Sequence, residues 1–198
     1  MKPLGTIAFL ARWPGVLVLE ELLRNPKIEL SGVYTHGKLP KAEGGEERPE
    51  LSFFKDLCYE RVPLYVIDGP ALTPPPQADL IICLSWRFIL PVGHAKIAAI
   101  NIHRGDLPKY AGARPVERAL MAGENRVAIT AHHMTEEIDA GDKIAAVYSG
   151  IPEARYNWTV QEHAEAVKEH LYPLYVPLVR LALATIRPTP KQGQEGRG

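Results

Sequence analysis

Short apolar runs and segments of helical periodicity alternate along the first part of the chain. Residues 4–10 form an almost wholly apolar run, which is typical of a buried strand. After Pro14, which suits the first turn of a helix, Val16 and Leu19 keep helical spacing. A second strand-like run, 28–35, follows directly. The order strand, helix, strand predicts parallel pairing with a right-handed crossover, which is how an α/β sheet begins.

The later pattern continues the same architecture. Residues 79–84 are nearly all apolar, as expected of a central strand covered on both faces. Residues 38–50 are rich in glycine, proline and charge and are expected to be an exposed loop. The other predicted elements are a short helix with Phe53, Phe54 and Leu57, strands at 64–67, 99–102, 126–134 and 144–150, a helix at 115–121 and a helix at 159–186. The expected fold class is α/β, with a Rossmann-like, doubly wound, mostly parallel sheet and a long C-terminal helix.

The length and composition fit one globular domain. The chain has 198 residues, of which 46% are hydrophobic and 23% charged, and a chain of this length buries about 70% of its unfolded surface. Residues 188–198 contain almost nothing to bury and are predicted to be a disordered tail. The predicted domain therefore comprises residues 1–187.

Charge, hydropathy and the metal-binding residue types narrow the class of function. Lys plus Arg and Asp plus Glu number 23 each, so no net field favours a nucleic acid or an anionic membrane. No apolar run reaches the ~20 residues that span a bilayer and no signal peptide is evident, so a cytoplasmic location is expected. Cys58 and Cys83 lack zinc-site spacing and are predicted to be buried free thiols. His132 and His133 face opposite sides of a predicted strand, so structural histidines are expected there rather than a metal site.

Polar residues of catalytic type follow the strand predicted at 99–102. Asn101 and His103 are two residues apart and face the same side of a strand, where an amide can donate to an oxyanion and an imidazole can exchange protons. The acidic turn 136–142 supplies Asp139, which would favour the charged form of that imidazole. Spacing alone more often reflects structural roles, with Asn101 capping a turn and His103 as an ordinary hydrogen-bonded histidine.

Several segments, taken in order, resemble the signature of folate-dependent formyltransferases. The matching segments are Asn101-Ile-His103, Leu107-Pro-Lys-Tyr110, Gly112, 119–124 and Ile138-Asp-Ala-Gly141. The resemblance implies the formyltransferase type of α/β fold and transfer of a formyl group from 10-formyltetrahydrofolate, the co-substrate, to an amine without a metal. It implies that Asn101 stabilises the tetrahedral intermediate, that His103 transfers protons and that Asp139 tunes this histidine.

The resemblance also implies where the folate binds. The pterin ring is expected between the loop after the central strand and the turn before Asp139, and Arg114 is expected to replace the arginine that the family has at Ala111. The residues expected to bind the folate are Phe88, Ile89, Leu90, Arg114, Thr135, Glu136, Glu137 and Ile138. The family's small polar residue and leucine after the histidine are replaced here by Arg104-Gly-Asp106, which bears on the substrate more than on the reaction.

The amine acceptor is narrowed by what the chain lacks. The turn 11–15 has no GxGxxG or P-loop and differs from the Gly-Ser-Asn phosphate loop of glycinamide ribonucleotide formyltransferases. The chain has neither the C-terminal domain of methionyl-tRNA formyltransferases nor a basic excess. Residues 33–37 resemble sugar-nucleotide N-formyltransferases, so a nucleotide-linked amino sugar or similar small metabolite is the expected acceptor. The alternatives are a formyltetrahydrofolate hydrolase and a non-catalytic folate-binding relative. A homodimer through the apolar face of the C-terminal helix is also expected.

Overall fold

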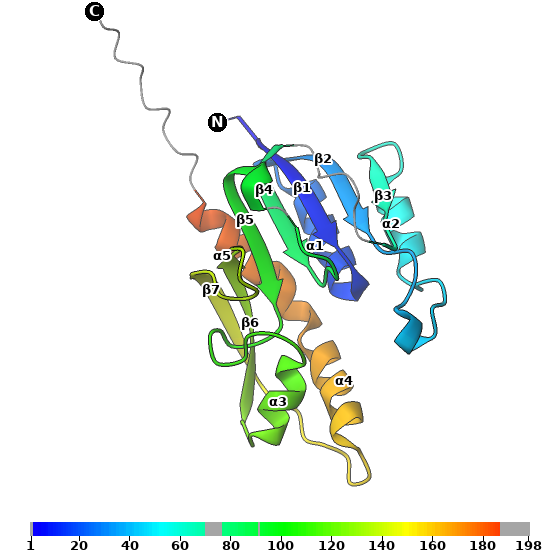
Figure 1. The fold of residues 1–198 in the computed structure, drawn as a ribbon, viewed down its shortest axis with the longest axis vertical. Coiled ribbons are helices and arrows are strands. Elements are labelled where there is room, and N and C mark those ends of the chain that lie inside the picture. Colours follow the sequence, from blue (N-terminus) through cyan, green and yellow to red (C-terminus); the bar gives the residue numbers. More distant parts are fainter. Residues whose placement is uncertain (1, 70–76, 91, 187–198) are drawn as a thin grey trace, which may run out of the picture.

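The computed structural model describes residues 2–69, 77–90 and 92–186, and in them the chain forms a seven-stranded sheet flanked by helices (Figure 1). The strand order is β3-β2-β1-β4-β5-β6-β7, in which β1 to β5 pair in parallel and β6 and β7 pair antiparallel to their neighbours. The strands are β1 (Leu4–Leu10), β2 (Ile28–Thr35), β3 (Leu64–Val66), β4 (Ala78–Leu84), β5 (Ala95–His103), β6 (Arg126–His133) and β7 (Lys143–Gly150). The helices are α1 (Arg12–Arg24), α2 (Leu51–Cys58), α3 (Pro115–Met121), α4 (Val160–His170) and α5 (Tyr175–Thr185), with 3-10 helices η1 (Lys41–Glu43), η2 (Val92–His94) and η3 (Tyr172–Leu174). The mostly parallel α/β sheet is confirmed.

Apolar side chains pack on both faces of the sheet. The larger core lies between the sheet and α1, α2 and α5, and it buries Leu19, Leu22, Phe54 and Leu178. Figure 1 shows α1 and α5 behind the sheet. On the other face, strand residues such as Phe9 pack against the segments that follow β4 and β6, and no α-helix joins this smaller core within the described residues. The carboxyl ends of the parallel strands are therefore bordered by helices on one face and by loops on the other.

Most predicted boundaries are confirmed to within a few residues, and the differences have local causes. The bounds of β2 and α3 are as predicted. Helix α1 begins at Arg12 rather than Pro14, because proline is tolerated within the first turn of a helix. Strand β5 begins at Ala95, because its pairing with β4 extends further back than the apolar run 99–102.

The prediction of one long helix at 159–186 is wrong. The segment is divided into α4 and α5 by η3, because Pro173 lacks the N–H that a continuous helix needs. The apolar face of α5 is buried in the larger core through Tyr175 and Leu178. The face that was expected to support a homodimer is therefore occupied by the chain's own sheet. The tail predicted at 188–198 lies outside the described residues.

The loop predicted to be exposed at 38–50 is partly buried. Arg48 and Glu50 are 2% and 4% exposed, and Nη1 of Arg48 donates to Oε1 of Glu50 at 3.0 Å. Nε of Arg48 also donates to the carbonyl oxygen of Lys38 at 3.1 Å. These bonds compensate the two charges for the loss of water, and the composition of the loop does not reveal them.

Cys58 and Cys83 are buried and unpaired, which confirms the prediction of free thiols. Burial raises the pKa of Cys58 to about 11 and that of Cys83 to about 12, so both remain protonated at neutral pH. None of the described helices combines the length and the apolar character needed to cross a membrane. The described residues also contain no cluster of His, Cys, Asp and Glu side chains suited to a metal ion.

Candidate active site

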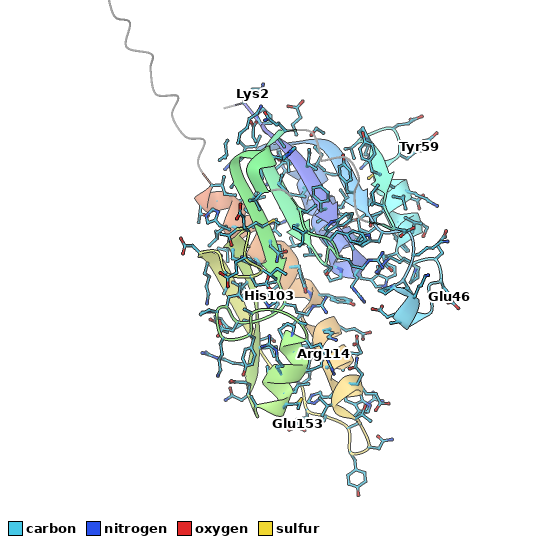
Figure 2. All side chains as sticks on the ribbon, in the orientation of Figure 1. Lys2, Glu46, Tyr59, His103, Arg114 and Glu153 are labelled. Carbon is cyan, nitrogen blue, oxygen red and sulfur yellow. The ribbon has the colours of Figure 1, made fainter. Side chains whose placement is uncertain are left out.

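Asn101 and His103 lie at the carboxyl end of β5, where the sheet changes from parallel to antiparallel pairing. Figure 2 shows His103 at this end of β5 and Arg114 at the start of α3. Asn101 and His103 both contact Asp139, as expected of side chains that share one side of a strand. The carboxyl ends of strands are where open α/β sheets bind their ligands, so this edge is the candidate site.

Asp139 joins the two side chains. Its Oδ2 accepts from Nδ1 of His103 at 3.1 Å and from the backbone N–H of Gly112 at 2.9 Å, and its Oδ1 accepts from Nδ2 of Asn101 at 3.2 Å. Burial alone would raise the pKa of Asp139, but hydrogen bonds from His103 and His132 hold this pKa well below its usual range. The carboxylate is therefore charged at neutral pH.

His103 faces an oxygen atom on each side of its ring. Nδ1 lies 3.1 Å from Oδ2 of Asp139, and Nε2 lies 2.8 Å from the carbonyl oxygen of Tyr110. Because an ionised carboxylate and a carbonyl only accept hydrogen bonds, both ring nitrogens must donate when both bonds form, and His103 is then an imidazolium. A ring in this state can give up a proton once either bond opens.

Close backbone approaches at two glycines shape the site. A Cβ on Gly105 would lie 2.7 Å from Nε2 of His103, so a side chain there would displace the imidazole. A Cβ on Gly141 would lie 1.9 Å from the carbonyl oxygen of His133, so the turn that carries Asp139 requires glycine. Asp139 itself has a φ of 55°, in the left-handed region that few non-glycine residues adopt. Strained backbone of this kind often accompanies functional residues.

His132 is the residue of this cluster that sequence reasoning missed. Its ring is 2% exposed, and Nε2 lies 3.1 Å from Nδ2 of Asn101 and 3.4 Å from Oδ1 of Asp139. With Nδ1 donating to the carbonyl oxygen of His133 at 2.9 Å, a neutral ring presents Nε2 as an acceptor to Asn101. The antiparallel register of β5 and β6 places Asn101 opposite His132. Only this register could have shown that His132 does more than pack in the sheet.

A cavity of about 970 Å³ opens at this end of the sheet and brings the predicted site residues together. Asn101, His103 and Asp139 all line it. The residues expected to bind the folate line it as well, namely Phe88, Ile89, Leu90, Arg114, Thr135, Glu136, Glu137 and Ile138. Leu90 is buried, whereas Ile89 and Ile138 are 85% and 69% exposed and offer apolar surface to a ligand. An amide, an imidazole and a carboxylate at such a cavity are suited to acyl transfer.

The comparison with protein families agrees with this site. Residues 71–176 match the model of the formyl transferase family, and the chain belongs to this family. It is 32% identical over 152 residues to the methionyl-tRNA formyltransferase of Protochlamydia amoebophila (strain UWE25), an alignment that covers 72% of this chain and 46% of that protein. It is 44% identical over 71 residues to the enzyme of the same name from Latilactobacillus sakei subsp. sakei (strain 23K), covering 34% and 22%. The chain thus spans less than half the length of these curated relatives.

Solved structures share the fold. The phosphoribosylglycinamide formyltransferase of Anaplasma phagocytophilum aligns with a TM-score of 0.62 at 17% identity, over 98% of this chain and 97% of that one. A formyltetrahydrofolate deformylase from Pseudomonas syringae pv. tomato str. DC3000 aligns with a TM-score of 0.61 at 18% identity, over 91% and 61%. Similarity at these identities concerns the fold alone, and it confirms the formyltransferase type of α/β fold.

Proposed function

We propose that this chain transfers the formyl group of 10-formyltetrahydrofolate to a primary amine of a small molecule. The observation that carries the proposal is the Asp139 carboxylate, which holds Asn101 and His103 together at the edge of the cavity. In the proposed reaction the amine attacks the formyl carbon and a new carbon–nitrogen bond forms. The bond from that carbon to the folate nitrogen then breaks, and tetrahydrofolate leaves.

Each polar side chain has one part in this proposal. Asn101 donates to the oxyanion of the tetrahedral intermediate, so one of its contacts with His132 or Asp139 gives way as charge develops. His103 gives a proton to the departing folate nitrogen and takes one from the attacking amine. Asp139 stabilises the imidazolium, and His132 orients the Asn101 amide without touching the reacting atoms.

The donor is proposed to lie on the loop side of the cavity. Residues 88–90 follow β4 and residues 135–138 follow β6, and both segments line the cavity beside Asp139. Leu90 belongs to the smaller core, on the face of the sheet that no described α-helix covers. A flat ring can lie there between apolar side chains and backbone groups, as ligand sites commonly combine apolar walls with a few polar contacts.

For the acceptor, a nucleotide-linked amino sugar is the first compound to test. This choice rests on the resemblance of residues 33–37 to sugar-nucleotide enzymes. The similar proteins carry the names of methionyl-tRNA and phosphoribosylglycinamide formyltransferases, so both of those substrates belong in the same panel.

The test is formation of tetrahydrofolate from 10-formyltetrahydrofolate, with and without each amine. His103→Ala and Asp139→Asn are expected to lower amine-dependent turnover by about 100-fold or more, the usual contribution of acid–base groups. His133→Ala and Asp142→Asn change exposed neighbours of the same residue types and are expected to keep wild-type turnover.

The other outcomes separate the alternatives. Turnover without any amine, lost in the Asp139 variant, would identify a formyltetrahydrofolate hydrolase. Folate binding without turnover would identify a non-catalytic relative. Full activity of His103→Ala would rule out the proposed proton transfer.

A further inference from the structure

Five arginines line the cavity, and one of them differs from the rest. Arg104 has no carboxylate within 4.0 Å among the described residues, and it directly follows His103. The other four are each paired, Arg12 with Glu43 at 3.2 Å, Arg48 with Glu50 at 3.0 Å, Arg87 with Asp68 at 3.8 Å and Arg114 with Glu117 at 4.0 Å. Arg104 is therefore the cavity arginine whose charge lacks a close counter-ion in the described part of the chain.

The Arg104 guanidinium is held in place from α5. Its Nε donates to the hydroxyl oxygen of Tyr175 at 2.8 Å, and the side chain is half-buried. Burial opposes its charge, but Tyr175 and the more distant Glu165 favour it, and the pKa of Arg104 lies above its usual value. Glu165 itself accepts from Nζ of Lys168 at 2.8 Å, so its carboxylate is already engaged. The terminal N–H groups of Arg104 make no bond to another described residue.

Arg104 lies on the opposite face from the proposed folate loops. Tyr175 belongs to the larger core under α5, whereas Leu90 and Met134 belong to the smaller core. Two substrates that react at His103 must approach it from different directions. If the folate occupies the loop side, the acceptor enters on the side of α4 and α5, where Arg104 is exposed to the cavity.

We propose that Arg104, positioned by Tyr175, binds an anionic group of the amine acceptor, a phosphate or a carboxylate. The inference rests on the proposed function, because it assigns a substrate class to the same cavity. A guanidinium presents parallel N–H donors that fit two oxygens of such a group. A half-buried cation without a counter-ion gains most from an anionic ligand, because the ligand replaces water that the cation has lost.

Binding of inorganic phosphate and of acetate, measured by calorimetry, tests the subsite without turnover. Arg104→Gln is expected to weaken binding about 10- to 100-fold, as loss of a charged hydrogen-bonding partner implies. Tyr175→Phe, which keeps the fold and removes the hydroxyl, is expected to weaken it less. Arg61→Gln removes an equal charge from an exposed turn and is expected to bind as the wild type does. Equal binding by Arg104→Gln and wild type, or no anion binding by the wild type, would overturn the proposal.

Matched amines connect the subsite to transfer. We would compare 3-aminopropanol, its phosphate ester and 4-aminobutyrate, so that phosphate and carboxylate are distinguished. The anionic amines are expected to have a lower KM than the alcohol, and Arg104→Gln to raise only their KM. Transfer that ignores both the charge and Arg104 overturns the inference and leaves the proposed function standing. Anion binding that depends on Arg104, with no amine formylated, leaves the subsite and overturns the proposed function.

Discussion

At the residue scale, the absence of a side chain at Gly105 controls the position of His103. A Cβ there would lie 2.7 Å from Nε2 of His103 and 2.7 Å from Cβ of Pro115. We therefore expect Gly105→Ala to lower turnover by 10-fold or more, roughly the loss that a displaced catalytic group causes. Gly150→Ala is the matched control, because nothing lies within 4 Å of its Cβ. Steady-state kinetics check this, and wild-type kcat in Gly105→Ala would contradict it.

His36 carries a second residue-scale prediction, on stability against pH. Its buried ring stacks on Trp86 at 4.0 Å, Nδ1 donates to the carbonyl oxygen of Ile67, and Nε2 accepts from the backbone N–H of Arg87. Chiefly because of burial, the pKa of His36 is lowered from 6.5 to about 4. A depressed folded-state pKa gives a contribution that is complete above the unfolded pKa and is lost as pH falls toward the folded one. The contribution is on the order of 3 kcal/mol.

Urea unfolding between pH 6.5 and 4.5 tests the role of His36. Wild type is expected to lose stability across this window, whereas His36→Phe, which keeps an aromatic ring on Trp86, should start lower and change less. His133→Phe replaces an exposed histidine and is expected to keep the wild-type slope. Identical slopes for wild type and His36→Phe would show that another group titrates.

At the scale of elements, α4 depends on its first turn. Thr159 Oγ1 accepts from the N–H of Glu162 at 3.2 Å, and Oε2 of Glu162 accepts from the N–H of Thr159 at 2.8 Å. Thr159→Ala is expected to lower the free energy of unfolding by about 1 kcal/mol and to increase amide exchange in α4. Ser52→Ala, exposed in α2, is the control and should be within about 0.5 kcal/mol of wild type. Unchanged exchange in α4 would contradict the capping role.

The elements also show which signals in the sequence are sufficient. Apolar periodicity located β1, β2 and α3, because each buries one face or a whole run locally. The same periodicity runs on through Pro173, so it favoured one long helix where the backbone requires two. The register between β5 and β6 left no local signal at all, although it brings His132 to Asn101.

For the whole molecule, we propose that residues 1–187 form the catalytic domain. The last described helix, α5, ends at Thr185 and packs against α1, β6 and β7. A chain that ends at residue 187 is therefore expected to have the unfolding midpoint and the anion affinity of the full chain. Thermal unfolding and calorimetry check this. A fall in stability of more than about 1 kcal/mol would show that residues 188–198 belong to the folded domain.

The amino-acid sequence by itself determined the α/β class, the order of most elements and the pair Asn101 and His103, because strand alternation and helical spacing are local properties. The role of Asp139 came from a motif resemblance, and the structure places its carboxylate against both side chains. Only the tertiary structure decided that His132 joins the cluster and that Arg104 faces the cavity without a close carboxylate among the described residues. These features depend on which distant segments pack together, and hydrophobic periodicity specifies the face that a segment buries but not its partner.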